Sequence, residues 1–464
     1  MPANVRKNVV NAEIFREYDI RGVYGSDFDD AFAHALGGAF VAYLEEKSDV
    51  RRPTLTVGYD ARLSSPALAR AMVDGMREAG AHVVTLGLVT TPLSYFSMHA
   101  VPGASGGIMI TGSHNPPEYN GFKISVGKTT IFGEQIQDLR RTMEAGKFPR
   151  DAGGTSASFD VFAPYVARYR EEFGAMKPVP VVLDCGNGVA GCVARRLYEG
   201  VGLKPLILFE EPDGRFPNHH PDPTVEKNLA DLKRAVLESG ARIGIGFDGD
   251  ADRIGIVDEA GRYVPGDEMM VIVSRAILEQ LPGAKIVGDV KCSDRLYDDV
   301  RRHGGVPIMW KTGHSLIKNK IKEERAPFGG ELSGHVFFSD RNYGFDDALY
   351  AGLRLVEILG KTGKTLSQLL EGFPPAFNTP EIRIDTTEEK KRAIVARLVQ
   401  LYAHDTAEYK VNMTDGVRIS FADGWALARA SNTQPVLVLR FESTSEKGLA
   451  AIRSRIEGVV NPLL

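Results

Sequence analysis

Short apolar runs rich in valine and isoleucine alternate with longer amphipathic segments along most of the chain. Apolar runs of about four to eight residues are typical of buried strands, and apolar positions recurring every three or four residues are typical of helices. This alternation favours an α/β fold. The first round predicts strands at Leu55–Tyr59, His82–Leu86 and Gly107–Ile110 and a helix at Pro66–Ala79.

Two further rounds repeat this pattern. The second predicts strands at Val179–Asp184, Pro205–Phe209 and Ile243–Phe247 and helices at Val189–Tyr198 and Val225–Ser239. The third predicts strands at Lys285–Val290 and Pro307–Trp310 and helices at Asp294–Arg302 and Leu316–Glu324. The opening strands of the three rounds end in aspartates, which are Asp60, Asp184 and Asp289.

Each round also contains one unusual polar loop flanked by apolar runs. These loops span residues 111–120, 248–253 and 329–335. In open α/β sheets, ligands bind beyond the carboxyl ends of the strands, where such loops lie. We therefore predict three related α/β units, each contributing one loop to a shared central cleft.

The chain beyond about Phe373 has a different pattern. A helix at Asp346–Leu359 leads towards this boundary. Helices at Glu388–Tyr402 and Lys447–Gly458 then flank three hairpin-like strands, Gly416–Phe421, Trp425–Ala428 and Val436–Phe441. This arrangement predicts a small α+β domain. The predicted organisation is three α/β domains with mixed sheets at 1–155, 156–256 and 257–372, followed by an α+β domain at 373–464.

Length and charge narrow the possible functions. A chain of 464 residues suits about three domains of roughly 150 residues each. The 56 basic and 60 acidic residues give a net charge of −4, which argues against a general nucleic-acid binder. Three cysteines without a CxxC pair, Cys185, Cys192 and Cys292, predict reduced thiols. Because no segment resembles a signal peptide or a membrane span, we expect a cytoplasmic protein without membrane partners.

The strongest local signal is the acidic loop Asp248–Arg253, with carboxylates at Asp248, Asp250 and Asp252. Three carboxylates two residues apart suit a hard divalent cation, and an all-oxygen set favours Mg²⁺ over zinc. The loop is not an EF-hand, since Arg253 stands where that motif requires glycine. An inert solvated turn is the plain alternative, but three unpaired carboxylates between apolar strands would repel one another.

A second candidate is the segment Thr111–Pro117, with Lys123 shortly after it. Ser113 lies on a glycine-flanked turn after a strand, so its hydroxyl is expected to be presented rather than buried in the core. His114 and Lys123 would position or activate that hydroxyl. The segment does not match G-x-S-x-G, so an α/β-hydrolase is not supported. An ordinary polar turn is the alternative.

Two more loops suit a sugar phosphate. Glu331, Ser333 and His335 alternate, so on an extended segment they would project to one face and bind sugar hydroxyls. In the segment 429–435, Arg429 accompanies hydroxyls, an amide and turn N–H groups, which together suit a phosphate. The alternatives are an exposed hairpin edge and a hydrophilic hairpin tip.

One motif favours a different class of enzyme. Gly186–Gly191 matches G-x-G-x-x-G between a strand and a helix, and Glu210 follows near the distance expected for a ribose-binding acid. An NAD(P)-dependent oxidoreductase is therefore one alternative, and a tight packing turn is another. Nucleotide binding would leave the acidic, serine and arginine loops unexplained.

Taken in this order, the four loops resemble those of the α-D-phosphohexomutase superfamily, and most closely its bacterial phosphomannomutase/phosphoglucomutase group. The resemblance runs through nearly the whole chain and includes residues 15–22, 58–62, 291 and 311–314. It implies three similar α/β domains and a C-terminal α+β domain around a central cleft.

The resemblance also implies roles for individual residues. Ser113 would be phosphorylated in the active enzyme and would bind Mg²⁺ together with Asp248, Asp250 and Asp252. Sugar hydroxyls would be held by Glu331 and Ser333, and the non-reacting phosphate by Arg429, Ser431, Asn432 and Thr433. Residues that match cleft-lining positions of the family are Tyr18, Arg21, Lys123, Lys291, His314 and His335. Lys123 and His335 are candidates for proton transfer. The charge of the phosphoserine site would be offset by Arg253, His114, Lys123 or Arg21.

The reaction implied is the Mg²⁺-dependent interconversion of hexose 1-phosphate and 6-phosphate, with a hexose 1,6-bisphosphate as intermediate and activator. The resemblance also implies a preference for mannose and glucose phosphates. Phosphomannomutase/phosphoglucomutases typically carry an apolar residue where Leu332 stands, whereas phosphoglucosamine mutases usually carry glutamine there and alanine where Gly112 stands. The alternatives are a phosphoglucosamine mutase, an NAD(P)-dependent oxidoreductase and a non-enzymatic sugar-phosphate sensor. We expect a monomer or a small homo-oligomer that binds hexose phosphates and no nucleic acid.

Overall fold

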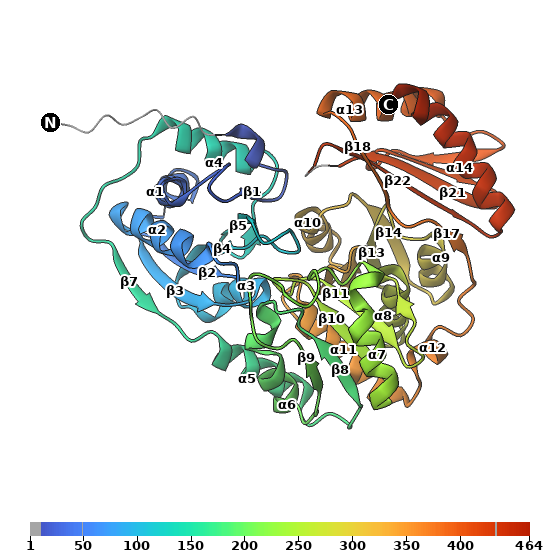
Figure 1. Cartoon of the computed structure of the whole chain (residues 1–464), viewed down its shortest axis with the longest axis horizontal. Helices are drawn as coiled ribbons and strands as arrows, with labels where there is room; N and C mark the ends of the chain where they lie inside the picture. The colour runs from blue at the N-terminus through green and yellow to red at the C-terminus, as the bar shows by residue number, and fades with distance from the viewer. Residues whose placement is uncertain (1–10, 49, 432–433) are drawn as a thin grey trace. The chain divides into compact units, whose positions relative to one another are not determined.

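The computed structural model describes residues 11–48, 50–431 and 434–464 (Figure 1). Its contacts divide the chain into two compact units. Unit 1 comprises Met1–Val264, Gly334–Val336 and Phe345–Leu366, and unit 2 comprises Pro265–Ser333, Phe337–Gly344 and Ser367–Leu464. Among the described residues, no helix combines the length and the apolar character needed to cross a membrane.

Unit 1 contains a seven-stranded mixed sheet in the order β1-β5-β4-β2-β3-β7, with β6 paired to β5. Its strands are β1 (Ile20–Val23), β2 (Thr54–Tyr59), β3 (His82–Leu88), β4 (Ala104–Ile110), β5 (Tyr119–Val126), β6 (Thr129–Thr130) and β7 (Thr155–Ser158). The accompanying helices are η1 (Ala12–Ile14), α1 (Asp30–Ser48), α2 (Ser65–Glu78), α3 (Thr91–Ala100) and α4 (Glu134–Ala145). Strand β2 runs parallel to β3 and β4, whereas β5 returns antiparallel to β4.

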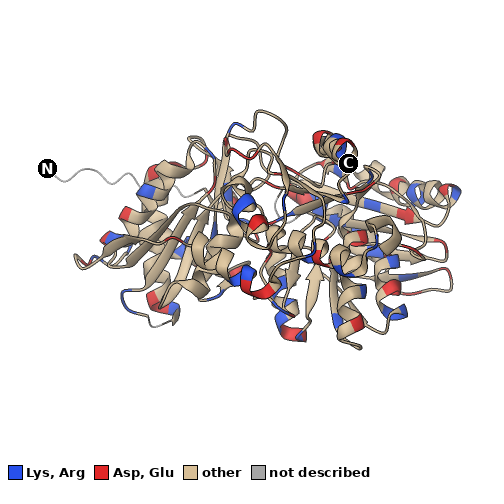
Figure 2. Ribbon diagram, turned by 90° about the horizontal axis from the view of Figure 1, so that it is seen from below, with Lys and Arg blue, Asp and Glu red and all other residues tan. Residues whose placement is uncertain are grey.

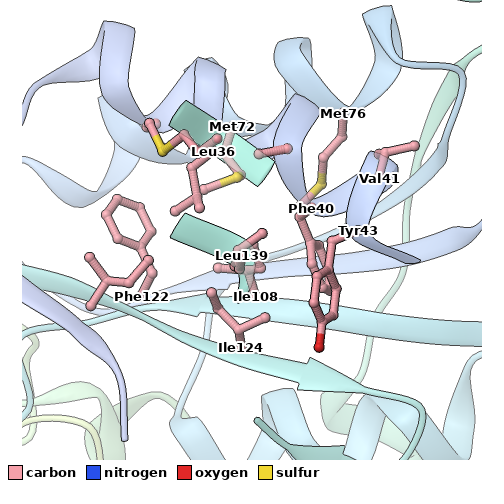
Figure 3. Close-up of a cluster of buried hydrophobic side chains, with 14 of the residues drawn as sticks. Leu36, Phe40, Val41, Tyr43, Met72, Met76, Ile108, Phe122, Ile124 and Leu139 are labelled. Atoms are coloured by element: carbon pink, nitrogen blue, oxygen red, sulfur yellow. The ribbon is translucent and has the colours of Figure 1, made fainter. Parts of the chain in front are cut away.

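Apolar side chains join this sheet to α1 and α2. Figure 3 shows Leu36, Phe40 and Met72 near Ile108 and Phe122 of the sheet. Leu36 and Phe40 are four residues apart on α1, so they lie on one face of the helix. Burying a leucine or phenylalanine side chain contributes about 1.5–3 kcal/mol each, and this packing keeps the carboxyl ends of β2 and β4 in place.

The second sheet of unit 1 has five strands in the order β12-β11-β10-β8-β9. They are β8 (Val181–Asp184), β9 (Leu206–Leu208), β10 (Ile243–Phe247), β11 (Ile254–Asp258) and β12 (Tyr263–Val264). The helices of this part are α5 (Phe162–Phe173), η2 (Val189–Cys192), α6 (Ala194–Gly200), η3 (Glu226–Leu229), α7 (Ala230–Ser239) and α11 (Ala348–Thr362). Strand β8 is parallel to both β9 and β10, and β11 is antiparallel to β10.

The third sheet has four strands in the order β14-β13-β15-β16. They are β13 (Lys285–Asp289), β14 (Val306–Trp310), β15 (Phe328–Gly330) and β16 (Val336–Phe338). The helices of this part are α8 (Gly266–Gln280), α9 (Asp294–Arg302), α10 (His314–Glu324) and α12 (Leu366–Leu369). Strand β13 is parallel to both β14 and β15.

These three sheets share one topology. In each, a central strand (β2, β8 or β13) has a parallel neighbour on either side. One of these neighbours (β4, β10 or β15) is followed in the sheet by the next strand of the chain (β5, β11 or β16). The three predicted polar loops leave the carboxyl ends of β4, β10 and β15. The prediction of three similar α/β domains is therefore confirmed, and the predicted residue boundaries stay predictions.

The C-terminal part of unit 2 is a six-stranded sheet in the order β17-β22-β21-β20-β19, with β18 paired to β22. Its strands are β17 (Phe377–Asn378), β18 (Ile382–Asp385), β19 (Tyr409–Asn412), β20 (Val417–Phe421), β21 (Gly424–Ala430) and β22 (Val436–Ser443). The helices are α13 (Glu388–Leu401), α14 (Glu446–Val460) and η4 (Asn461–Leu463). Among the described residues, the paired strands of this sheet are antiparallel, which confirms the predicted α+β domain.

Several predicted helices differ at their starts, and α10 begins two residues earlier than predicted, at His314. The predicted helices Val189–Tyr198 and Val225–Ser239 are each divided, because η2 and η3 precede α6 and α7. The predicted helix at Asp346 begins two residues later, since Asp347 caps α11 by accepting the N–H of Tyr350 at 3.0 Å.

Figure 2 shows basic and acidic residues interspersed on the helices, so neither sign of charge dominates them.

Candidate active site

The loop after β4 holds Ser113 in an uncommon conformation. Its φ angle is 49°, which is left-handed and costs a non-glycine residue about 1–3 kcal/mol. Arg62 stabilises this loop by donating to the carbonyls of Ser113 at 2.8 Å, Asn115 at 2.6 Å and Tyr119 at 2.8 Å. Arg62 is itself buried and bonded to Asp60 at 3.1 Å. The buried ion pair of Arg62 and Asp60 thus holds the loop in this conformation.

Gly112 allows Arg62 to approach the loop this closely. A Cβ atom at residue 112 would lie 2.4 Å from Cζ and Nε of Arg62. The Gly112 N–H donates to Asp60 at 3.1 Å, and its carbonyl accepts from Arg21 at 3.0 Å. Asp60 and Arg62 were not predicted as site residues from the sequence. The position of Asp60 at the end of the first predicted strand, where ligands are expected in such a sheet, could have indicated it.

The acidic loop after β10 lies against Ser113. Asp248, Asp250 and Asp252 are fully buried, and one carboxylate oxygen of each lies within 4.8 Å of the others. The Ser113 hydroxyl donates to Oδ2 of Asp248 at 2.9 Å. Ser113 is itself buried, so the expectation of a presented hydroxyl is wrong, and the reason is that the acidic loop packs against it. The structure therefore brings together the two strongest candidates from the sequence, which are 135 residues apart.

Buried charge shifts the pKa values of this group. Burial and the charges of Asp250 and Asp252 raise the pKa of Asp248 well above its ordinary value. Burial also acts to raise the pKa of Asp250, but the charge of Lys123 lowers it overall. Lys123 Nζ lies 2.7 Å from Asp250 Oδ2 and also contacts Asp252. Although burial opposes it, these carboxylates raise the pKa of Lys123, so this lysine is held as a cation.

Two carboxylate oxygens of the loop fit a further cation. Asp250 Oδ1 and Asp252 Oδ1 are buried and accept no hydrogen bond within the described part of the chain. Buried carboxylate oxygens are costly unless a donor or a cation compensates them. The other oxygen of Asp250 accepts the Thr91 hydroxyl at 2.5 Å. An all-oxygen set of this kind suits a hard divalent ion.

His335 lies beside the same loop. Its backbone forms an isolated β-bridge with Arg253, and Arg253 Nε donates to His335 Nε2 at 2.8 Å. His335 Nδ1 lies 3.1 Å from Oδ2 of Asp346 and 3.6 Å from Oδ1 of Asp252. The structure thus unites the predicted residues Arg253 and His335, and it adds Asp346, which was not predicted.

His114 points towards a carboxylate that was also not predicted. Its Nδ1 lies 2.8 Å from Oδ2 of Asp222. Burial and the charge of Arg253 lower the pKa of His114 to about 4, so its imidazole is neutral at pH 7. The two other candidates in unit 1 are Tyr18, which is buried, and Arg21, which pairs with Asp19.

The predicted sugar and phosphate residues lie in unit 2. Lys291, just after β13, has its Nζ 3.3 Å from Oε2 of Glu381 and 3.7 Å from Oδ2 of Asp289. The charge of Lys291 lowers the pKa of Glu381 to about 2, although burial opposes the shift. Burial acts to lower the pKa of Lys291, but these carboxylates raise it overall, so Lys291 is also held as a cation.

Two predicted substrate residues, Glu331 and Arg429, are connected through the backbone of the loop before α10. Glu331 Oε1 accepts the N–H of Gly313 at 2.5 Å. Asp415 Oδ2 accepts the N–H of Thr312 at 3.0 Å and Nε–H of Arg429 at 2.9 Å. The predicted sugar residue and the predicted phosphate residue are therefore tied to adjacent residues of one loop.

The remaining candidates of unit 2 are His314, Ser333, Ser431, Asn432 and Thr433. His314 is buried at the start of α10, and Ser333 lies in the turn after β15. The Ser431 carbonyl accepts Lys391 Nζ at 2.6 Å. The candidates Asn432 and Thr433 lie outside the described residues. The shared cleft stays a prediction.

The predicted extended row at Glu331, Ser333 and His335 is wrong. Strand β15 ends at Gly330, and the following residues form a turn in which Gly334 has a φ angle of 85°. Side chains alternate between two faces only on an extended strand, so the row does not form.

The glycine motif at residues 186–191 has a packing role. A Cβ atom on Gly191 would lie 1.6 Å from the carbonyl oxygen of Glu210. The Glu210 carboxylate accepts from Arg195 at 2.6 Å. The acid that would bind a ribose is thus already paired, and the close approach requires glycine. This geometry favours the packing turn over nucleotide binding.

Models of the domains of one protein family match the chain in order. Those described as phosphoglucomutase/phosphomannomutase alpha/beta/alpha domains I, II and III match residues 12–150, 163–261 and 265–377. The model described as the C-terminal domain of the same family matches residues 381–459.

Curated proteins resemble the chain over almost its full length. A phosphomannomutase/phosphoglucomutase of Pseudomonas aeruginosa is 43% identical over 443 residues, which are 96% of this chain and 94% of that protein. A phosphoglucomutase of Neisseria gonorrhoeae is 41% identical over 458 residues, which are 98% of each.

Solved structures of other proteins are similar in fold to this chain. A phosphoglucomutase/phosphomannomutase family protein of Burkholderia thailandensis has a TM-score of 0.89 and 42% identity, and covers 97% of both chains. A structure described as a putative phosphomannomutase from Thermus thermophilus has a TM-score of 0.79 and covers 96% of this chain and 98% of its own. At 23% identity, this second likeness concerns the fold alone.

Proposed function

Since the chain belongs to the phosphoglucomutase/phosphomannomutase family and is a hexose-phosphate mutase, we propose that it interconverts the 1- and 6-phosphates of mannose and glucose through a phosphoserine at Ser113. One observation carries the assignment of Ser113, which is the 2.9 Å contact between its hydroxyl and Asp248. A serine held by a fixed loop beside three buried carboxylates has the surroundings expected of a phosphoryl carrier next to a metal ion.

Asp248, Asp250 and Asp252 would bind Mg²⁺ together with an oxygen of Ser113. Their all-oxygen donor set and the two buried oxygens without donors, on Asp250 and Asp252, support this assignment. Bound there, the ion would supply a Lewis acid that stabilises the serine oxygen as the phosphoryl group leaves.

Lys123, Arg253 and Arg21 would supply positive charge around the phosphoserine, with His114 beside it. A phosphoserine adds about −1.5 to −2 charges to the three aspartates at pH 7. The contacts of Lys123 with Asp250 and Asp252 support a fixed electrostatic role for this residue.

His335 is then the better candidate for the proton acceptor. A sugar hydroxyl loses its proton to His335 as its oxygen bonds to phosphorus and the bond from phosphorus to the Ser113 oxygen breaks. The product is a hexose 1,6-bisphosphate. In the second transfer the other phosphoryl group moves to the Ser113 oxygen, and His335 returns a proton to the sugar oxygen. The phosphoserine is regenerated, so no proton or phosphoryl group is lost.

The candidates of unit 2 would bind the sugar and its non-reacting phosphate. Glu331 and Ser333 would bind hydroxyls, and the phosphate would be held by Arg429, Ser431, Asn432 and Thr433. The part-buried pair of Arg429 and Asp415 supports this, because a guanidinium oriented by a carboxylate is suited to binding a phosphate through paired hydrogen bonds. Tyr18, Lys291 and His314 would also contact the substrate.

The choice of sugar rests mainly on Leu332. This apolar residue between Glu331 and Ser333 favours mannose and glucose phosphates over glucosamine phosphate. Gly112 carries less weight than its sequence suggested, because the close approach of Arg62 accounts for a glycine there.

A competition experiment tests the substrate. Phosphorus NMR would follow mannose, glucose and glucosamine 1-phosphates in one sample with the protein, Mg²⁺ and a trace of glucose 1,6-bisphosphate. We expect mannose and glucose 6-phosphates to form first. If glucosamine 6-phosphate forms first, the protein is a phosphoglucosamine mutase and the inference from Leu332 is wrong. The cytoplasmic location and the monomeric or small oligomeric state stay predictions from the sequence.

A further inference from the structure

Helix α3 begins at a residue that contacts the acidic loop twice. The Thr91 N–H donates to the carbonyl of Asp250 at 2.9 Å, and the Thr91 hydroxyl donates to Oδ2 of the same aspartate at 2.5 Å. The two residues are 159 positions apart in the sequence, and both are fully buried. Since α3 contains none of the site residues predicted from the sequence, this contact adds a new element to the support of the site.

The first turn of α3 holds the Thr91 side chain in place. Thr90 caps the helix by accepting the N–H of Leu93 at 3.2 Å, and Pro92 lies in the first turn, where its fixed φ angle suits a helix. A threonine side chain also has few rotamers, because it branches at Cβ. The Thr91 hydroxyl therefore reaches Asp250 from a well-defined position.

The two oxygens of the Asp250 carboxylate have different surroundings. Oδ2 accepts the Thr91 hydroxyl and also lies 2.7 Å from Nζ of Lys123. Oδ1 is buried and accepts no hydrogen bond from the residues that the structure describes. A buried carboxylate oxygen without a donor is costly unless a cation compensates it. The two donors on Oδ2 thus orient the carboxylate and leave Oδ1 for an ion.

Thr91 and Lys123 contribute differently to this orientation. Lys123 also contacts Asp252, so its ammonium group is shared between two carboxylates. The Thr91 hydroxyl is a neutral donor, so its removal changes the support of the Asp250 carboxylate without changing the charge of the site. Carboxylates that bind metal ions are held by such hydrogen bonds, and the loss of one typically weakens metal binding about 10- to 100-fold.

The backbone of the acidic loop is held in the same region. Ala251 has a φ angle of 62°, a left-handed conformation that a non-glycine residue keeps only where its surroundings hold it. The Thr91 N–H bonds to the carbonyl that precedes Ala251, and Ala348 at the start of α11 donates its N–H to the Ala251 carbonyl at 3.3 Å. A substitution of the Thr91 side chain leaves these backbone bonds in place, so it tests the hydroxyl.

We propose that Thr91 is a positioning residue for the metal site. Its hydroxyl holds Oδ2 of Asp250, so that Oδ1 is available to a divalent cation. The proposal rests on the proposed binding of Mg²⁺ by Asp248, Asp250 and Asp252. It deepens that assignment by a residue of α3 that acts only through Asp250.

Binding of Mn²⁺, which suits the same oxygen donors as Mg²⁺, tests the proposal without measuring turnover. Electron paramagnetic resonance would follow free Mn²⁺ during titration of each variant, with equal phosphorylation of all samples checked by intact mass. Thr91→Val keeps the shape of the side chain and removes the hydroxyl, and we expect its Kd for Mn²⁺ to rise about 10- to 100-fold. Thr91→Ser keeps the hydroxyl and should stay within about threefold of the wild type.

Ser97→Ala is the matched control, because it removes another buried hydroxyl of α3, which donates to the Ser94 carbonyl at 2.6 Å. We expect this variant to bind Mn²⁺ as the wild type does. Thr91→Ala removes the same hydroxyl as Thr91→Val without adding a methyl group, and it takes the place of Thr91→Val if that variant does not fold. A Kd of the variant without the hydroxyl no higher than that of the control would overturn the proposal.

The Mg²⁺ dependence of turnover gives a second readout. In Thr91→Val, the Mg²⁺ concentration for half-maximal turnover should rise about 10- to 100-fold, with kcat at saturating Mg²⁺ within about threefold of the wild type. A loss of kcat that saturating Mg²⁺ does not restore would contradict a role in metal binding.

Asp250→Asn separates this proposal from the proposed function. If Asp250→Asn binds Mn²⁺ as tightly as the wild type, the proposed metal site is wrong and the role of Thr91 is lost with it. If Asp250→Asn loses binding and Thr91→Val keeps it, the metal site stands and only the role of Thr91 is refuted.

Discussion

Lys291 and Glu381 form a partly exposed ion pair whose contribution to stability depends on pH. The charge of Lys291, opposed by burial, lowers the pKa of Glu381 from 4.5 to about 2. A carboxyl group with a lower pKa in the folded protein binds its proton more weakly there than in the unfolded chain. The pair therefore stabilises the fold fully at neutral pH, and this stabilisation is lost as the pH falls from about 4.5 through 2.

We expect Glu381→Gln to lower the free energy of unfolding at pH 7 by about 1–3 kcal/mol, because Lys291 keeps its burial and loses its nearest charge. The difference from the wild type should shrink as the pH is lowered from 5 to 3. Urea denaturation at several pH values measures both effects. Glu279→Gln, at an exposed position of α8, is the control and should change little. A difference that stays constant down to pH 3 would contradict this account.

Single residues differ in how well their roles could be predicted. Ser113 and the acidic loop carry local signals, namely a glycine-flanked turn and three carboxylates at a spacing of two. The pairing of Lys123 with Asp250 joins residues 127 positions apart, so it depends on the packing of elements. Asp346 was predicted to lie inside a helix. Nothing in the neighbouring sequence indicates that the helix begins only at Ala348 or that Asp346 lies beside His335.

At the scale of elements, the sheet β20–β22 shapes the turn that presents Lys291. Arg418 on β20 donates to the carbonyl of Cys292 at 2.9 Å, and its Cζ lies 3.6 Å from the ring centre of Trp425. Arg440 on β22 donates to the carbonyl of Lys291 itself. Two buried arginines from one sheet thus satisfy the carbonyls of a turn that follows another sheet.

We expect Arg418→Met to destabilise the protein by about 2–4 kcal/mol, because it leaves buried carbonyls without their donor. It should also raise KM for the sugar phosphate, since the turn carrying Lys291 loses its support. Thermal unfolding and steady-state kinetics measure the two effects. The control is Arg301→Met, which removes an exposed arginine of α9 paired with Asp298. A loss of stability no greater than in this control would show that the sheet does not support the turn.

The elements themselves were predictable wherever apolar periodicity was clear. The predicted strand Ile243–Phe247 and the predicted helix Asp294–Arg302 coincide with β10 and α9. The prediction failed at Glu331, Ser333 and His335, because alternation was read as an extended strand. The left-handed Gly334 turns the chain there, and a glycine does not by itself reveal the sign of its φ angle.

At the scale of the whole molecule, the repeated sheet topology places a functional loop after the same strand in each of three domains. The order of motifs along the chain predicted this repetition and the different C-terminal domain. It did not predict that Thr91 and Asp222, which carry no motif of their own, contact the acidic and serine loops, nor that Arg62 bonds to the carbonyl of Ser113. These contacts arise only when the sheets and helices of unit 1 are packed.

Every step of the proposed reaction requires that Ser113 carries the phosphoryl group. Phosphorus NMR of Ser113→Ala with mannose 1-phosphate, Mg²⁺ and mannose 1,6-bisphosphate tests this role, alongside binding of the sugar phosphate by calorimetry. The matched control is Ser105→Ala on β4, where the hydroxyl donates to the Gly103 carbonyl at 3.3 Å, far from the acidic loop in the sequence. We expect wild-type turnover in the control and at least a roughly thousandfold loss in Ser113→Ala, with binding retained. Turnover of Ser113→Ala within about tenfold of the wild type would contradict the claim.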